Sequence, residues 1–185
     1  AIAKAISAAG ESGGGIVVIP PGEWLTAQVH LKSNVNLHLM KGAVLLFSDN
    51  PSDYLPAVHS TWEGLECYNY SPLIYAYQCK NVAITGEGEV QALMDNWKKW
   101  AGRPRAHMNS LKNLYYWAFD NKPVNERNMV NDSSNLRPQF IQFNRCENIL
   151  IDGVSIKNSP FWTIHLYLSK DIVVRNVKVW AHGHN

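Results

Sequence analysis

The chain has 185 residues, with 17 basic and 15 acidic side chains and a formal net charge of +2. This length suits one domain with a sizeable core, and the sequence has no apolar run of about 18 residues that would predict a membrane span. The basic excess is small and falls in one segment, which disfavours a nucleic-acid partner.

The first ten residues predict a capping helix. Ile2, Ile6 and Ala9 share one helical face, and Gly10 is placed to end the helix. After three glycines, the apolar run at 16–19 indicates a fully buried strand. An amphipathic helix before the first strand would cover an open strand edge, which otherwise recruits other chains. We therefore expect 1–10 to cap one end of a stack of strands.

A short phrase recurs along the chain: a small polar residue, then Asn or Asp, then alternating aliphatic residues. It reads Cys-Lys-Asn-Val-Ala-Ile at 79–84, Cys-Glu-Asn-Ile-Leu-Ile at 146–151 and Ser-Lys-Asp-Ile-Val-Val at 169–174, with a shorter form at 33–37. Repeats of this kind are typical of a coiled stack of short parallel strands. Asn at a tight turn tolerates unusual backbone angles and bonds neighbouring amides, so the fold alone explains this polar position.

The spacing of the repeat predicts two insertions. The last two repeats are 23 residues apart, a reasonable length for one coil, whereas Asn81 and Asn148 are 67 apart. That larger gap fits one coil plus roughly 44 extra residues. The 47-residue gap from Asn34 to Asn81 fits two coils, or one coil with an excursion of about 24 residues. Polar, aromatic-rich stretches at 49–72 and 95–137 account for the excesses as projecting loops, where substrate contacts usually lie on such stacks.

Segment 95–137 is both basic and aromatic. It contains eight Lys and Arg residues against four Asp and Glu, and its rings are Trp97, Trp100, Tyr115, Tyr116, Trp117 and Phe119. Aromatic faces lie on sugars and arginine binds carboxylates through two parallel hydrogen bonds, so this composition suits an acidic polysaccharide. The rings would equally serve to dock the insertion onto the stack, and the sequence leaves both interpretations open. In the other insertion, Glu66, Tyr68 and Tyr70 are weaker candidates for substrate binding.

The three cysteines are predicted to be free and structural. Cys79 and Cys146 occupy the same place in the repeat, where they would stack as small buried residues, and Cys67 makes the count odd. We expect neither a disulfide nor a metal site here, and the sequence predicts no cofactor.

Several runs together resemble glycoside hydrolase family 28, the polygalacturonases. The most specific is Asn-Ser-Pro-Phe-Trp-Thr-Ile-His at 158–165, and the strands before it, 136–143 and 148–154, are similar to those of bacterial members. The segment Trp-Glu-Gly-Leu-Glu-Cys-Tyr-Asn-Tyr-Ser-Pro-Leu-Ile-Tyr at 62–75 is similar to one in the bacterial pectin-degrading branch, and 14–22 resembles the first coil. The resemblance covers nearly the whole chain.

This resemblance implies an all-β, right-handed parallel β-helix that hydrolyses galacturonosyl links in pectin with inversion. Inversion needs two carboxyl groups about 6.5–9.5 Å apart, one protonating the leaving oxygen and one activating water. Trp162 and His165 lie in the signature run, as packing residues or as residues flanking the cleft. Arg137 is the basic residue we select for substrate binding, because it stands where the second insertion rejoins the coil.

None of the family's catalytic signatures is complete in this sequence. The family places Asn-any-Asp one coil after the signature run, where this chain has Ala-His-Gly-His-Asn at 181–185. Asn185 would be the first residue of that motif, and His184 beside it a substrate contact; His182 is a weaker candidate. The resemblance thus implies a single β-helix domain over 1–185 that is incomplete at its C-terminus, and a chain that does not itself turn over polygalacturonate.

Two other functions remain open at this point. A pectate-lyase-like enzyme would use the same architecture, although it usually needs a cluster of acidic residues for calcium, which the strand repeats lack. A non-catalytic polysaccharide-binding β-helix is the third interpretation.

In each case the expected partner is an acidic pectic polysaccharide or oligosaccharide, and the resemblance implies a periplasmic or extracellular location. Galacturonan versus rhamnogalacturonan, endo versus exo attack and the oligomeric state are left open, although long loops at one end of a cleft favour exo attack.

Overall fold

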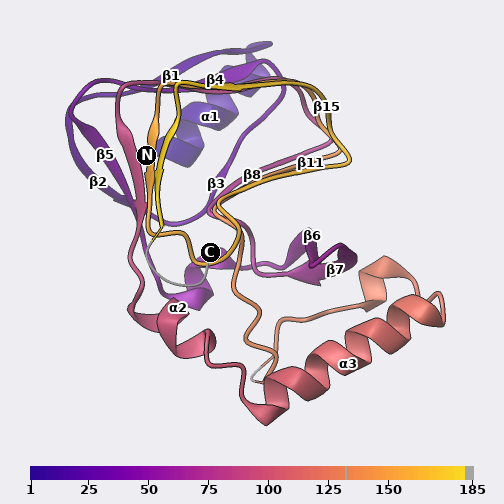
Figure 1. The fold of residues 1–185 in the computed structure, drawn as a ribbon. Helices are drawn as coiled ribbons and strands as arrows, with labels where there is room; N and C mark the ends of the chain where they lie inside the picture. Colours follow the sequence, from indigo (N-terminus) through magenta and orange to yellow (C-terminus); the bar gives the residue numbers. More distant parts are fainter. Residues whose placement is uncertain (132, 182–185) are drawn as a thin grey trace.

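The computed structural model of the chain describes residues 1–131 and 133–181, which wind into a right-handed parallel β-helix (Figure 1). Three parallel sheets form its walls. Sheet A contains β1 Gly15–Ile19, β4 Val35–Leu39, β9 Lys80–Gly86, β12 Glu147–Asp152 and β15 Lys170–Arg175. Sheet B contains β2 Gly22–Thr26, β5 Ala43–Phe47, β10 Glu89–Ala92, β13 Ser155–Lys157 and β16 Lys178–Trp180. Sheet C contains β3 Val29–His30, β8 Ile74–Tyr77, β11 Ile141–Asn144 and β14 Ile164–Tyr167.

The repeated phrases stack directly on one another, as their pattern predicts. In sheet A, β9 pairs with β4 on one side and with β12 on the other. The 47-residue gap therefore contains one coil and an excursion, not two coils. Val82 lies beside Ile149, and Ile84 beside Leu37 and Ile151, so the alternating aliphatic residues form continuous ladders inside the helix. These ladders are the hydrophobic core, since all of them are at most 1% exposed.

A helix covers the first coil. In α1, Ile2–Glu11, Ile6 is buried against the core, with Ile2 and Ala9 packed beside it. The prediction that Gly10 ends the helix is wrong, because the chain enters the left-handed region only at Gly13. At Gly10 a Cβ would lie 3.0 Å from the Cβ of Lys32, so this glycine allows the helix to approach the first coil closely.

The first strand differs from its prediction. The run at 16–19 is apolar throughout, yet β1 buries only alternate residues: Val17 and Ile19 point inward, while Ile16 is 66% exposed. In this β-helix the strand packs on the core with one face only, so an unbroken apolar run overstates its burial.

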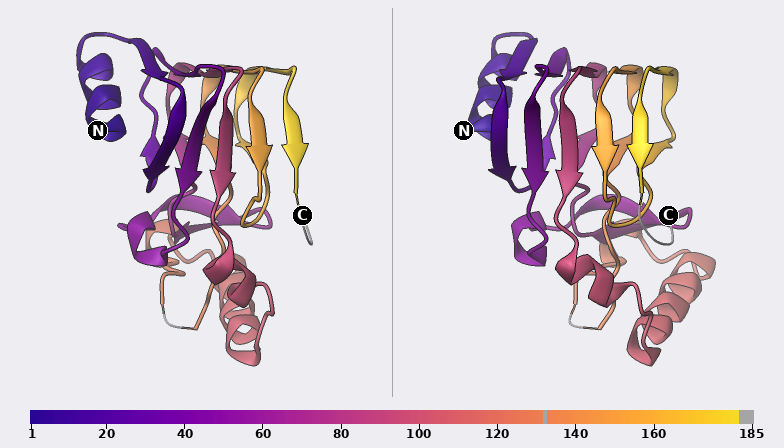
Figure 2. Two further views of the ribbon diagram at one scale, coloured as in Figure 1. Left: turned by 90° about the vertical axis from the view of Figure 1, so that its left-hand side faces the viewer. Right: turned by 60° about the vertical axis from the view of Figure 1, so that its left-hand side comes forward.

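Both insertions leave the stack between sheet B and sheet C, on the same side of the molecule (Figure 2). They were expected as loops, but each contains regular structure. The first holds the short helix η1, Pro51–Tyr54, and an antiparallel hairpin of β6, Val58–Trp62, and β7, Leu65–Asn69. The second holds α2, Asp95–Trp100, α3, Arg105–Phe119, and η2, Val124–Glu126.

The two insertions share a small core of their own. Its residues come from the hairpin, α3, the segment after η2 and the turn before β14: Trp62, Cys67, Leu111, Leu114, Met129, Leu136 and Phe161. This cluster fixes the hairpin and α3 to each other and to the stack. A long segment inside a compact domain needs such packing to stay ordered.

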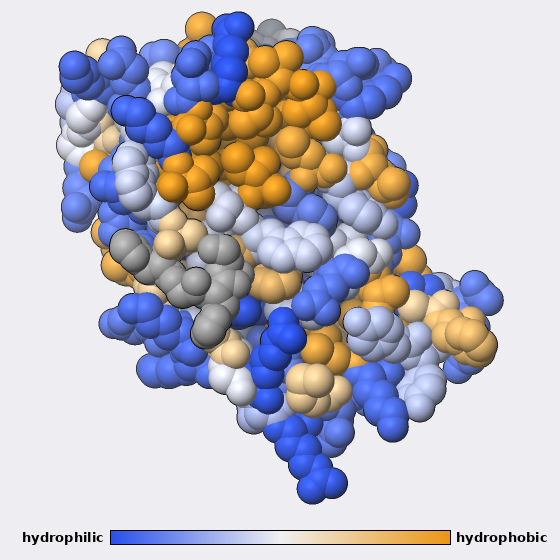
Figure 3. Space-filling view, viewed as in Figure 1, coloured by the Kyte–Doolittle hydropathy of each residue, from blue (hydrophilic) through white to orange (hydrophobic). Residues whose placement is uncertain are grey.

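The end of the stack opposite α1 presents an apolar surface (Figure 3). The inward-facing residues of the last coil are partly exposed, among them Ile172 at 36%, Val174 at 42% and Val179 at 48%.

No helix among the described residues is long and apolar enough to cross a membrane.

Candidate functional site

The hairpin lies against the outward face of sheet C and forms a wall beside β14. Its backbone carbonyl at His59 accepts hydrogen bonds from the Tyr75 hydroxyl, at 2.5 Å, and from the Asn144 side-chain amide, at 3.2 Å. Farther along, the carbonyl of Thr61 accepts a bond of 2.8 Å from the Gln139 amide. The outward face of β11 is thereby buried, whereas Trp162, before β14, is 39% exposed. We define the site surface as the outward face of β14 with its preceding turn and the adjoining side of the hairpin.

A buried polar row leads from the hairpin to His165. On sheet C, the aligned positions are His30, Tyr75, Gln142 and His165. The Ser60 hydroxyl, on β6, donates to Gln142 Oε1 at 2.9 Å, and Gln142 Nε2 lies 2.9 Å from His165 Nδ1. Burial lowers the pKa of His165 below its usual value, so the imidazole is neutral near pH 7.

A second polar cluster surrounds Glu66 on β7. Its carboxylate accepts hydrogen bonds from His59 Nε2, at 3.0 Å, and from Arg145 Nη2, at 2.5 Å. The Tyr68 ring stacks on His59, with ring centres 5.8 Å apart. Arg145 belongs to the turn between β11 and β12, and its backbone amide bonds the carbonyl of Tyr167 on β14. The hairpin and the last coils are thus joined by charged side chains at this edge.

A stack of rings forms the other border of the surface. Phe161 lies parallel to Trp62, with centres 4.2 Å apart, and parallel to Trp162 at 5.3 Å. The edge of Trp162 meets the His165 ring at 5.0 Å. Arg137 lies on Phe161, with its guanidinium carbon 5.3 Å from the ring centre, and donates to the carbonyl of Pro160 at 2.7 Å.

Four of the predicted site residues converge on this surface: Trp162 and His165 from the signature run, Glu66 and Tyr68 from the hairpin. Tyr167 connects the two pairs, since its ring lies 5.6 Å from that of His165. The pKa of Tyr167 is raised mainly by burial and further by the nearby Glu66 carboxylate.

Arg137 occupies a different setting from the one predicted. Only 8% of it is exposed, and its guanidinium is engaged by Phe161 and the Pro160 carbonyl, which positions the turn before β14. These contacts hold the turn in place, and substrate binding by Arg137 stays a prediction. The predicted contacts His182, His184 and Asn185 lie outside the described residues.

Sequence reasoning missed three residues of the surface. Arg145 precedes the repeated phrase at 146–151 and belongs to no motif, and His59 lies in an insertion without a periodic pattern. Gln142 lies in the strand 136–143 that resembles the family, but nothing in that strand singled it out. The alternation of inward and outward residues along β11 predicts that the Gln142 side chain faces outward, and this was the one sequence signal that could have identified it as a residue of the site surface.

The aromatic residues of the second insertion divide between two roles. Trp97 is fully buried and packs on Tyr54 and Trp100, as expected for rings that dock the insertion. On α3, by contrast, Tyr115, Tyr116 and Phe119 are exposed, the last at 84%.

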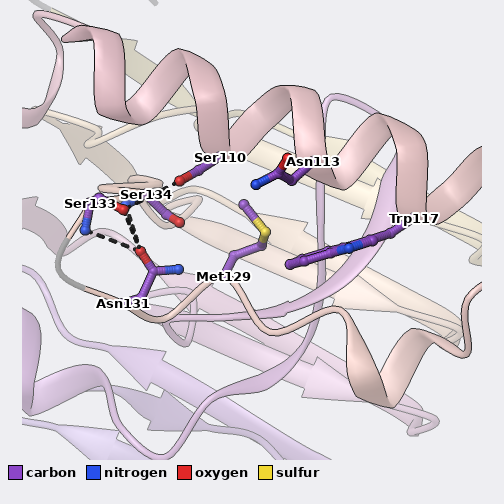
Figure 4. Close-up of a pocket in the computed structure, with 7 residues that line it drawn as sticks. All are labelled: Ser110, Asn113, Trp117, Met129, Asn131, Ser133 and Ser134. Atoms are coloured by element: carbon purple, nitrogen blue, oxygen red, sulfur yellow. Dashed lines mark hydrogen bonds between the residues drawn. The ribbon is translucent and has the colours of Figure 1, made fainter.

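A hollow of about 410 Å³ lies between α3 and the segment after η2 (Figure 4). The described residues that line it are uncharged: Ser110, Asn113, Trp117, Met129, Asn131, Ser133 and Ser134. Among the described residues, none of the basic side chains of this insertion belongs to that lining, so these residues offer no positive charge to a carboxylate ligand. Among residues 1–131 and 133–181, no three His, Cys, Asp or Glu side chains come together as metal ligands do.

Comparisons with known proteins point to one family. A profile described as Glycosyl hydrolases family 28 matches residues 124–185. A probable polygalacturonase of Vitis vinifera is 26% identical over 181 residues, covering 95% of this chain and 31% of its own length. The Exo-poly-alpha-D-galacturonosidase of Dickeya chrysanthemi is 28% identical over 200 residues, covering 95% of this chain and 32% of its own length. The chain therefore spans about a third of the length of these relatives.

Solved structures agree with the fold. The crystal structure of a hyperthermoactive exopolygalacturonase from Thermotoga maritima superposes with a TM-score of 0.91 at 40% identity, over 98% of this chain and 43% of that one. The polygalacturonase of Erwinia carotovora, at 20% identity, superposes with a TM-score of 0.62 over 96% of this chain and 46% of its own, which is a likeness of fold.

Proposed function

Since this chain belongs to glycoside hydrolase family 28, we propose that it is part of an enzyme that hydrolyses galacturonosyl links in pectic polysaccharide. The observation that carries the proposal is the 40% identity to an exopolygalacturonase over 98% of this chain. Because the superposition covers 98% of this chain, it takes in the segments that contain the hairpin and the signature run.

The chemistry of the site surface suits a chain of uronic acids. Trp162 and Tyr68 supply ring faces on which a sugar can lie. Arg145, whose side chain is 36% exposed, supplies charge-assisted hydrogen bonds for a carboxylate. The guanidinium is held on one side by Glu66 and has further N–H groups for a ligand. We assign carboxylate recognition to Arg145 in place of Arg137.

Inversion is the expected stereochemistry for the enzyme as a whole. Two carboxyl groups about 6.5–9.5 Å apart must act on opposite faces of the sugar ring. Glu66 already accepts hydrogen bonds from Arg145 and His59, which favours a role in positioning these two side chains. We therefore attribute the catalytic pair to the family's Asn-any-Asp and Asp-Asp motifs, of which Asn185 would be the first residue.

The hairpin also favours attack at chain ends. Because it covers the outward face of β11, a polysaccharide lying on sheet C would meet a wall on that side. A site closed at one end accepts a chain terminus more readily than an internal segment. Pectin is an extracellular polymer, so we further propose a periplasmic or extracellular location.

The function is tested by comparing this 185-residue chain with a polypeptide extended to the length of its relatives. The extended protein should release reducing sugar from polygalacturonate, with the inverted anomer appearing first in proton NMR spectra. The 185-residue chain should release none but should bind trigalacturonate. An extended protein that leaves unsaturated products absorbing near 235 nm would be a lyase, and the proposal would be wrong.

A further inference from the structure

We propose that Ser60 and Gln142 are positioning residues that hold His165 in one tautomer, with its proton on Nε2, so that the ring donates a hydrogen bond to an oxygen of the bound uronate. The inference rests on the proposed function for the identity of the ligand. The tautomer itself is a property of the unliganded chain and is tested separately.

The orientation of the Gln142 amide determines the tautomer. Gln139 Nε2 donates to the carbonyl of Thr61, so Gln139 presents its oxygen to Ser60 at 3.3 Å. The Ser60 hydroxyl has one proton, and its contact with Gln142 Oε1 is shorter, at 2.9 Å. The hydroxyl therefore donates to Gln142, and the Gln142 NH₂ group is turned toward His165.

This arrangement leaves one role for each ring nitrogen of His165. An amide NH₂ cannot accept a hydrogen bond, so Nδ1 of His165, 2.9 Å away, must be the acceptor and carries no proton. In the neutral ring the proton is then on Nε2. The opposite arrangement would have Ser60 donate to Gln139, turn the Gln142 oxygen to His165 and place the proton on Nδ1.

The surroundings of His165 suit a neutral donor. The ring centres of Trp162 and Tyr167 lie 5.0 and 5.6 Å from that of His165, and the Gln142 side chain is hydrogen-bonded to Nδ1. Within the described part of the chain, no protein group bonds Nε2, and the residue is only half-buried. Burial lowers the pKa of the imidazole, so it stays uncharged and donates without forming an ion pair.

A fixed neutral donor also has a consequence for recognition. Hydroxyl and carboxylate oxygens of galacturonate both accept hydrogen bonds, so Nε2–H can orient either beside the Trp162 ring. Ser60 and Gln142 are fully buried and held between the hairpin and sheet C, so their side chains lose little further conformational freedom when they orient His165.

The test is the ¹⁵N–¹H correlation spectrum of the histidine rings in the 185-residue chain near pH 7.5. Wild-type His165 should show the Nε2–H tautomer. Ser60→Ala should allow the amide to turn and mix the two tautomers, and Gln142→Glu should move the proton to Nδ1, since a carboxylate only accepts. Thr61→Val is the matched control: Thr61 is equally buried and adjacent, and its hydroxyl has no partner among the described residues, so His165 should not change.

Two outcomes would overturn the proposal that Ser60 and Gln142 fix the tautomer of His165. One is an Nδ1–H tautomer in the wild type, and the other is a Ser60→Ala spectrum identical to that of the wild type. Trigalacturonate is then added. A shifted Nε2–H resonance, and binding weakened about tenfold by His165→Phe, support the donor role. Trigalacturonate that binds equally well to His165→Phe removes the donor role but leaves the proposed function. Absence of any trigalacturonate binding counts against the proposed function, while the tautomer result stands by itself.

Discussion

The side-chain amide of Asn148 donates to the side-chain oxygen Oδ1 of Asn81, 2.8 Å away on the neighbouring coil, and the Asn81 amide donates in turn to Oδ1 of Asn34 at 2.7 Å. All three residues have positive φ, at 57°, 54° and 62° respectively. Asn is the side chain best suited to this position, because it tolerates the left-handed region and has both a donor and an acceptor for its neighbours.

We expect Asn81→Ala to lower the free energy of unfolding by about 2 kcal/mol, through left-handed strain and the loss of two ladder bonds. Asn81→Gly removes the same bonds without the strain, so it should cost less, about 1 kcal/mol. Urea unfolding of the three proteins measures both. Equal costs for Ala and Gly would contradict the backbone argument.

A second prediction concerns Gly153, where the chain turns after β12. Its φ is +85°, and a Cβ there would lie 2.4 Å from the carbonyl oxygen of Gly86 on the adjacent coil. Gly153→Ala combines strain with a clash against backbone, so it should cost about 3–5 kcal/mol. Gly64→Ala is the control, since Gly64 has a φ of +93° but no atom near a Cβ, and should cost about 1 kcal/mol. Similar thermal unfolding of the two variants would rule out the close contact.

Stability should fall between pH 7 and pH 5. Burial lowers the pKa of His30, His107 and His165, the first with help from Lys32. The unfolded chain, with histidine pKa values of about 6.5, then binds more protons than the folded one in this range. The stabilisation is full above the unfolded pKa and is lost as the pH falls below it. Urea unfolding at both pH values should give the lower free energy at pH 5, and His165→Gln should reduce the difference. A free energy that is higher at pH 5 would refute the prediction.

Substitution of Arg137 should lower mainly the stability of the fold, whereas substitution of Arg145 should lower mainly the affinity for trigalacturonate. Arg137→Met removes a buried bond to Pro160 and the contact with Phe161, and should cost about 1–3 kcal/mol of stability. Arg145→Gln removes a half-exposed ion pair with Glu66 and should cost at most about 1 kcal/mol. Trigalacturonate binding should weaken about tenfold in Arg145→Gln. If Arg137→Met keeps its stability and loses binding, the original assignment of Arg137 was right.

The sequence predicted the fold well because the repeated phrases mark turns that stack. The spacing of Asn148 and Asp171 indicates the length of a coil, and the longer gap from Asn81 to Asn148 indicates an insertion. The gap from Asn34 to Asn81 fitted either two coils or one coil with an excursion, and only the pairing of β4 with β9 decided between them. Interior positions such as Ile84 and Ile151 follow from strict alternation, which has a period of two in any strand.

The site was only partly predictable. Trp162 and His165 were found through a family signature, whereas Arg145 and Gln142 depend on how the hairpin lies over sheet C. That placement comes from the contact of Trp62 with Phe161, two residues far apart in the sequence. The burial of Arg137 could not be predicted for the same reason, since it depends on the Phe161 ring that covers the guanidinium, and its role in substrate binding stays a prediction.

The central claim is that pectic oligosaccharide binds on the face of β14 beside the hairpin. Chemical-shift mapping of the 185-residue chain with trigalacturonate tests it most directly. We predict saturable shifts at the Trp162 indole, the His165 ring and the Arg145 side chain, with Tyr115, Tyr116 and Phe119 on α3 unchanged. Shifts confined to α3, or none at millimolar trigalacturonate, would contradict it.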